Sequence, residues 1–96
     1  MITRQMLNKK REAILEIAGK YGAHDVRIFG SVVRGENTEA SDLDILVRFD
    51  PDRTLMDHAA LIGKLEDLLG VKIDVIDADG MRPRFREVVE KEALLL

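Results

Sequence analysis

Two short segments of this chain carry residue types that bind anions and cations. Gly30 and Ser31 follow an apolar stretch where a helix can begin, so backbone N–H groups, the Ser31 hydroxyl and the positive end of the helix dipole would converge on an anion. Asp42 and Asp44 follow a polar loop and alternate with aliphatic residues, so at the strand period both carboxylates leave one face. A phosphate site beside two carboxylates predicts a bound cation.

A third carboxylate, Asp74, interrupts a later apolar stretch on a different predicted strand. Transfer of a nucleotidyl group needs an attacking oxygen, a leaving pyrophosphate and divalent cations on both sides of the phosphorus. Asp42 and Asp44 would hold the metal ions. Asp74 could complete the ligand set of the metal nearer the nucleophile and, in the same position, could accept the proton of the incoming hydroxyl. Ser31 would hold the β- and γ-phosphates, and Gly30 would let phosphate approach the backbone because it has no Cβ.

The hydrophobic pattern predicts the elements that position these residues, in the order α-β-α-β-α-β-α. A capping box at Thr54 and Asp57 and a glycine at position 70 bound the third helix. The pattern indicates an α/β chain that forms one domain over residues 1–96. The predicted helices are 3–21, 31–34, 54–69 and 85–96, and the predicted strands are 26–29, 43–49 and 72–76.

Length and composition limit the classes of function. A chain of 96 residues has no room for a separate substrate-recognition domain, so we expect the substrate to arrive on a partner. The formal net charge of -3 argues against nonspecific nucleic-acid binding as the main role. The absence of cysteine fits a reducing cytoplasm, and no apolar run approaches the roughly 20 residues of a membrane helix, so we expect a cytoplasmic protein without membrane contact.

These residues together resemble the signature of the DNA polymerase β-like nucleotidyltransferase superfamily, and the short chain is similar to its minimal nucleotidyltransferase (MNT) branch. The resemblance extends over residues 26–74. It implies an α+β fold with a small mixed β-sheet flanked by helices, ATP as substrate, and two Mg²⁺ ions in the roles assigned above. The residues that carry it are Gly30-Ser31, Arg34-Gly35, Ser41-Asp42-Leu43-Asp44 and Asp74.

The resemblance also implies a partner. Members of the MNT branch pair with a HEPN-domain toxin and act as its antitoxin in a type VII-like toxin–antitoxin system, and some transfer AMP to a tyrosine of that toxin. We therefore expect a protein adenylyltransferase that forms a hetero-oligomer with its toxin. Two alternatives stay open: an antitoxin that masks its toxin by binding alone, and nucleotidyl transfer to a small molecule or an RNA.

Each candidate residue also has a purely structural explanation. The pair Asp42 and Asp44 could be solvated residues of a sheet edge, and Asp74 could lie on an exposed face or pair with Lys72. Ser31 could act only as an N-cap. Arg34 could contact a phosphate or could pair with a neighbouring acid. Those acids are Glu36, Glu39 and Asp42. The later arginines at 82, 84 and 86 could approach a nucleotide or an acidic partner, or could form a solvated face.

Overall fold

The computed structural model describes residues 2–96. A mixed four-stranded sheet has the order β3-β2-β1-β4, with β2 parallel to β3, and with β1 antiparallel to both β2 and β4. The expected α+β class with a small mixed sheet flanked by helices is therefore confirmed. The elements are α1 (Arg4–Lys9), α2 (Arg11–Lys20), β1 (Ala23–Phe29), α3 (Ser31–Arg34), β2 (Leu43–Phe49), α4 (Leu55–Leu69), β3 (Ile73–Asp77), the 3₁₀ turn η1 (Ala78–Gly80), α5 (Pro83–Glu92) and β4 (Leu94–Leu95).

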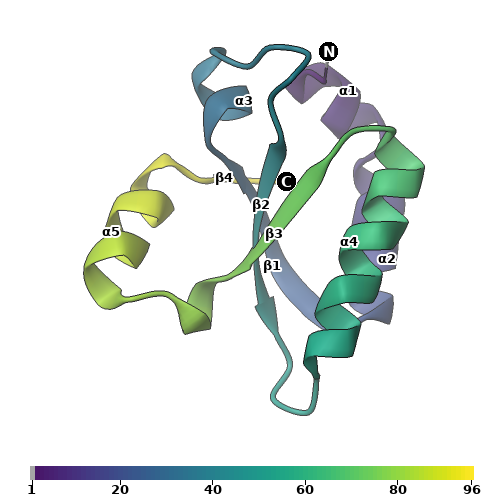
Figure 1. Ribbon diagram of the computed structural model, residues 1–96, viewed down its shortest axis with the longest axis vertical. Coiled ribbons are helices and arrows are strands. Elements are labelled where there is room, and N and C mark those ends of the chain that lie inside the picture. Colours follow the sequence, from purple (N-terminus) through teal and green to yellow (C-terminus); the bar gives the residue numbers. More distant parts are fainter. Residues whose placement is uncertain (1) are drawn as a thin grey trace.

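The two faces of the sheet are covered differently (Figure 1). Helices α2 and α4 lie together on one side, and α5 lies on the other. Because successive residues of a strand alternate, β2 directs Leu43, Ile45 and Val47 into the larger core beneath α2 and α4. Asp44 and Leu46 face the α5 side. The smaller core there consists of Phe29, Leu46, Ala78 and Val89.

Helix α4 connects the two parallel strands β2 and β3. Its predicted capping box is present: the Thr54 hydroxyl accepts the Met56 N–H at 3.2 Å, and Asp57 accepts the Thr54 N–H at 3.0 Å. Gly70 ends the helix in the left-handed region, with φ 67°. This crossover brings β3 alongside β2. In the part of the chain that the structure describes, no helix combines the length and apolar character needed to cross a membrane.

Arg48 on β2 ties α5 to the sheet. Its guanidinium donates to Asp25 of β1 at 3.2 Å, to Asp79 of η1 at 2.5 Å and to Glu90 of α5 at 3.2 Å. Asp25 adopts φ 55° where the pairing of β1 with β2 shifts register, and it also accepts a hydrogen bond from Arg27. The hydrogen bond from Arg27, followed by that from Arg48, lowers the pKa of Asp25. This network fixes α5 across three other elements.

The prediction of one continuous helix over 3–21 is wrong. The chain turns at Lys10, with φ -101° and ψ 10°, and forms α1 and α2 instead of one helix. The turn brings the start of α1 to the loop after α3, where Asn37 donates to the Ile2 carbonyl at 2.9 Å. Lys10 itself donates to the carbonyl of Leu68 at 3.1 Å. Contacts with distant segments therefore override the helical pattern of this stretch.

The predicted helix over 85–96 is wrong at its end. Helix α5 begins at Pro83 and ends at Glu92, and Leu94 and Leu95 form β4 against Ile28 and Arg27 of β1. The edge of β1 offers unpaired N–H and C=O groups, and an extended chain satisfies them. The observed element order therefore ends in a strand that the predicted order α-β-α-β-α-β-α omits.

Candidate functional site

Two of the predicted aspartates lie side by side on adjacent strands. Asp44 of β2 and Asp74 of β3 are register partners in the parallel pair, so their side chains leave the same face of the sheet. Asp42 directly precedes β2. Because β2 lies between β1 and β3, the explanation of Asp42 and Asp44 as residues of a sheet edge is wrong. Asp74 lies on the outer strand and is exposed, and no ion pair with Lys72 forms among residues 2–96.

The three carboxylates repel one another. Burial is the main cause that raises the pKa of Asp44, and the negative charges of Asp74 and Asp42 raise it further. Arg34 opposes these effects. The folded protein therefore holds a concentration of negative charge around Asp44, and a cation bound there would relieve it.

Gly30 separates β1 from α3 in a conformation that other residues avoid. Its φ is 81° and its ψ is -153°. A Cβ built on Gly30 would lie 2.2 Å from Oδ2 of Asp44 and 3.1 Å from its Cγ. The sequence-based explanation for this glycine was clearance for a phosphate. In the structure, the space of the missing Cβ is next to Asp44, so the start of α3 and the carboxylate are in direct contact.

Ser31 is the first residue of α3, and Gly30 is its N-cap. The explanation of Ser31 as an N-cap is therefore wrong. Among residues 2–96, neither the hydroxyl nor the N–H of Ser31 has a hydrogen-bond acceptor within the protein. Helix α3 has only four residues, so its dipole is small, and these two donors are the main attraction for an anion.

Arg34 lies at the end of α3 and forms two ion pairs. Its Nε donates to Glu36 at 3.0 Å, as one sequence alternative predicted, and its Nη1 donates to Glu92 at 2.5 Å. The hydrogen bond to Glu36 and the charge of Glu92 raise the pKa of Arg34. Glu92 also accepts the N–H of Gly30 at 3.1 Å. Sequence analysis missed Glu92, because it lies 62 residues from Gly30 and belongs to no local motif.

The donor set fits a hard divalent cation. Mg²⁺ binds a few carboxylate oxygens together with substrate phosphates, and the register pair Asp44 and Asp74 with Asp42 nearby offers such oxygens. Within residues 2–96 the side chains are not arranged as a group of three metal ligands. To bind one ion together, the side chains of Asp42, Asp44 and Asp74 would have to turn toward it.

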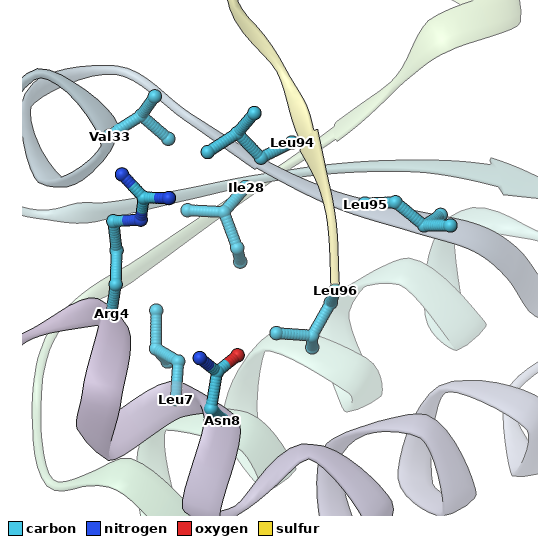
Figure 2. A pocket seen from close by; sticks show the side chains of 8 residues that line it. All are labelled: Arg4, Leu7, Asn8, Ile28, Val33, Leu94, Leu95 and Leu96. Atoms are coloured by element: carbon cyan, nitrogen blue, oxygen red, sulfur yellow. The ribbon is translucent and has the colours of Figure 1, made fainter.

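A cavity of about 70 Å³ lies between α1 and β4 (Figure 2). Sites for small ligands have volumes of about 300–1,000 Å³, so this cavity is too small for a nucleotide. None of the predicted site residues contributes to it. Its lining consists of Arg4, Leu7, Asn8, Ile28, Val33, Leu94, Leu95 and Leu96.

The late arginines have separate surroundings. Arg86 pairs with Glu90 at 3.3 Å and with Asp79 at 3.8 Å, so it belongs to the network that holds α5. Arg82 and Arg84 are exposed. The structure thus brings together the aspartates, Gly30, Ser31 and Arg34, and it leaves these arginines outside that group.

Comparison with known proteins identifies the family. The nucleotidyltransferase domain family matches residues 7–96. The chain belongs to this family. The nucleotidyltransferase is 35% identical over 88 residues to a protein of Methanocaldococcus jannaschii named as a protein adenylyltransferase, a match that covers 92% of this chain and 95% of the relative. A solved structure described as a minimal nucleotidyltransferase has a TM-score of 0.90 and 49% identity, and the match covers 99% of this chain and 97% of that one. The predicted MNT resemblance is confirmed.

The nucleotidyltransferase also shares its fold with a chain of a solved toxin–antitoxin complex. That complex, from Shewanella oneidensis, contains a tri-AMPylated HEPN toxin and an MNT antitoxin. The TM-score is 0.71, the identity is 17%, and the match covers 94% of this chain and 71% of that one. At this identity the likeness shows the fold alone.

Proposed function

We propose that this nucleotidyltransferase transfers AMP from ATP to a hydroxyl group of a partner protein. The observation that carries the proposal is the side-by-side placement of Asp44 and Asp74 on parallel strands, with Asp44 next to the start of α3 at Gly30. This arrangement brings a carboxylate cluster next to the free donors of Ser31. A nucleoside triphosphate needs both kinds of group, because its phosphates accept hydrogen bonds and carry the charge that bound cations offset.

Different residues bind the phosphates and the metal ions. The hydroxyl and N–H of Ser31 donate to the β- and γ-phosphates, and Gly30 leaves the space that brings Asp44 next to them. Asp42, Asp44 and Asp74 would hold two Mg²⁺ ions. When bound, Mg²⁺ stabilises the charge that develops on the transferred phosphate and on the leaving pyrophosphate.

The reaction exchanges one phosphorus–oxygen bond for another. The hydroxyl oxygen of the acceptor attacks the α-phosphorus and forms a new P–O bond. The bond from the α-phosphorus to the oxygen of the β-phosphate breaks, and pyrophosphate leaves with the bonding electrons. The exposed carboxylate of Asp74 takes the proton of the acceptor hydroxyl, since it lies on the outer strand where a partner can approach.

We further propose that the acceptor is a tyrosine of a HEPN-domain toxin, and that the chain is the antitoxin of that toxin. Two observations support this proposal: the relative named as a protein adenylyltransferase, and the shared fold with a complex of an MNT antitoxin and an AMPylated HEPN toxin.

The test incubates the purified protein with Mg²⁺, α-labelled ATP and the product of the gene neighbouring its own, which the proposal expects to be a HEPN-domain protein, followed by intact mass measurement of both chains. The proposal predicts that the partner gains whole AMP units, and that Asp42→Asn abolishes the gain while the variant stays folded. Peptide mapping then locates the modified residue. Undiminished transfer by Asp42→Asn contradicts the assigned role of the aspartates.

Masking of the toxin by binding alone is the second candidate. The exposed apolar side chains on α5 favour it: Phe85 is 58% exposed and Val88 is 61% exposed. Under this alternative, Asp42→Asn and Asp44→Asn proteins protect cells from the toxin as well as the wild type does. Loss of protection together with loss of transfer excludes masking as the mechanism.

A further inference from the structure

Glu92, the last residue of α5, accepts hydrogen bonds from two donors beside Ser31, the residue proposed to bind the phosphates. Its Oε1 accepts the Gly30 N–H at 3.1 Å and a hydrogen bond from Nη1 of Arg34 at 2.5 Å. The side chain is 28% exposed, so it lies partly within the site. Its charge also acts on Asp44. One carboxylate of the chain thus takes two of the donors that surround the start of α3.

A carboxylate and a phosphate can accept hydrogen bonds from the same donors. Both are anions that accept charge-assisted hydrogen bonds, and two anions on one N–H and one guanidinium nitrogen repel each other. Arg34 keeps a second contact, because its Nε donates to Glu36 at 3.0 Å. If Glu92 moved away, Nη1 of Arg34 would stay positioned and would become available to a ligand.

We propose that Glu92 is an internal competitor for the phosphates of the nucleotide. The inference rests on the proposed function and adds a residue that regulates nucleotide binding at the same site. Glu92 leaves Gly30 and Arg34 when a triphosphate binds, and its presence weakens binding of any nucleotide that reaches those donors. Arg34 then changes its partner from the carboxylate to phosphate, which is one of the two roles that the sequence left open for this arginine.

The fold permits this exchange without unfolding α5. The helix is held at Glu90 by Arg48, one half-turn before Glu92. The chain becomes extended directly after Glu92, at Ala93 with φ -66° and ψ 138°. Glu92 therefore lies at the junction of a fixed helix and an extended segment, where a side chain can turn while the helix stays in place.

The experiment measures binding of an ATP analogue with a methylene group between the α- and β-phosphorus atoms, by calorimetry with Mg²⁺ present. We expect Glu92→Gln to bind the analogue about tenfold more tightly than the wild type, a coupling of ordinary size for two competing groups. The same variant should bind AMP with unchanged affinity, because AMP lacks the β- and γ-phosphates. Its melting temperature should fall slightly, since the ion pair with Arg34 is lost.

Glu87→Gln is the matched control. It removes the same charge from the same helix, but Glu87 is 70% exposed and pairs only weakly with Lys91 at 3.6 Å. We expect its affinity for the analogue to equal that of the wild type. If Glu92→Gln binds the analogue as tightly as the wild type or more weakly, the inference is overturned, and Glu92 then only stabilises the fold through its contacts with Gly30 and Arg34. Failure of the wild type to bind the analogue overturns the proposed function instead.

A second measurement uses the wild type alone. Addition of the analogue should shift the ¹³C resonance of the Glu92 carboxyl group, because this group loses the N–H of Gly30 and the guanidinium of Arg34. Addition of AMP should leave the resonance in place. An unchanged resonance with bound analogue contradicts the proposed exchange.

Discussion

A Cβ on Gly30 would lie 2.2 Å from Oδ2 of Asp44. The segment expected to bind phosphate and the carboxylate expected to bind metal are therefore in contact without any side chain between them. This contact joins the end of β1 to the start of β2, which are antiparallel neighbours with Phe29 opposite Asp44. The two halves of the candidate site are thus one structural unit.

Gly30→Ala should disrupt this unit. The backbone conformation of Gly30 is one that residues with a Cβ adopt only under strain, and the added carbon collides with Asp44. We expect a loss of about 2–4 kcal/mol of stability, measured by thermal or denaturant unfolding, together with loss of AMP transfer. Gly63→Ala is the control, because Gly63 lies inside α4 with open space at its Cβ and should gain about 0.5–1 kcal/mol. An unaltered melting temperature for Gly30→Ala would contradict the assigned contact.

Asp44→Asn should raise stability at neutral pH. The pKa of Asp44 is raised by burial, Asp74 and Asp42, so its ionised form is disfavoured in the folded protein. The stability contributed by this group is present below the ordinary Asp pKa of 3.8 and is lost as pH rises through the raised value. We expect the variant to melt roughly 2–4 °C above the wild type at pH 7. The difference should disappear near pH 3, and Mg²⁺ should stabilise the wild type more than the variant.

Asp74→Asn should lower AMP transfer by about 10²–10⁴-fold, the usual contribution of a proton acceptor. Asp77→Asn is the matched control on the same strand. Asp77 accepts the N–H of Asp79 at 3.0 Å and so caps η1, away from the register pair with Asp44. We expect Asp77→Asn to retain transfer and to lose only a little stability. Equal loss in the two variants would remove the special role of Asp74.

Arg48→Lys should loosen α5. A lysine keeps the charge but cannot bridge Asp25, Asp79 and Glu90 at once. We expect a loss of about 1–2 kcal/mol and faster amide hydrogen exchange in residues 83–92. Arg84→Lys makes the same substitution at an exposed position of α5 and should change stability by less than about 0.5 kcal/mol. Unchanged exchange in α5 would show that the apolar contacts of Val89 suffice.

Local patterns predict most of the fold. The apolar stripe of α4, its capping box at Thr54 and Asp57, and the alternation around Asp44 each depend on neighbours in sequence, and each agrees with the structure. The end of the chain shows the limit of such patterns. The apolar run at Leu94 and Leu95 suits either a helix or a strand, and the free edge of β1 determines the outcome.

In the candidate site, too, local patterns predict some residues, and contacts between distant segments determine others. The placement of Asp42 and Asp44 on one strand is a local property, and the motif predicts it. Glu92 is one of many acidic residues in the sequence, and only the packing of α5 brings it to Gly30 and Arg34. No periodicity or spacing could have distinguished it from the neighbouring Glu90, which bonds instead to Arg48.

The parallel pairing of β2 and β3 also determines at which stage of folding the carboxylates of Asp44 and Asp74 come together. Parallel strands pair only after the crossover between them has formed. Closing this crossover costs conformational entropy before the contacts between the strands stabilise it. A chain with only β1, α3 and β2 assembled has the free donors of Ser31 and the carboxylates of Asp42 and Asp44, but not the pair of Asp44 and Asp74. Under the proposed function, molecules in which β3 has not yet joined the sheet lack the carboxylate that accepts the proton of the acceptor, so we expect transfer only from the completed sheet.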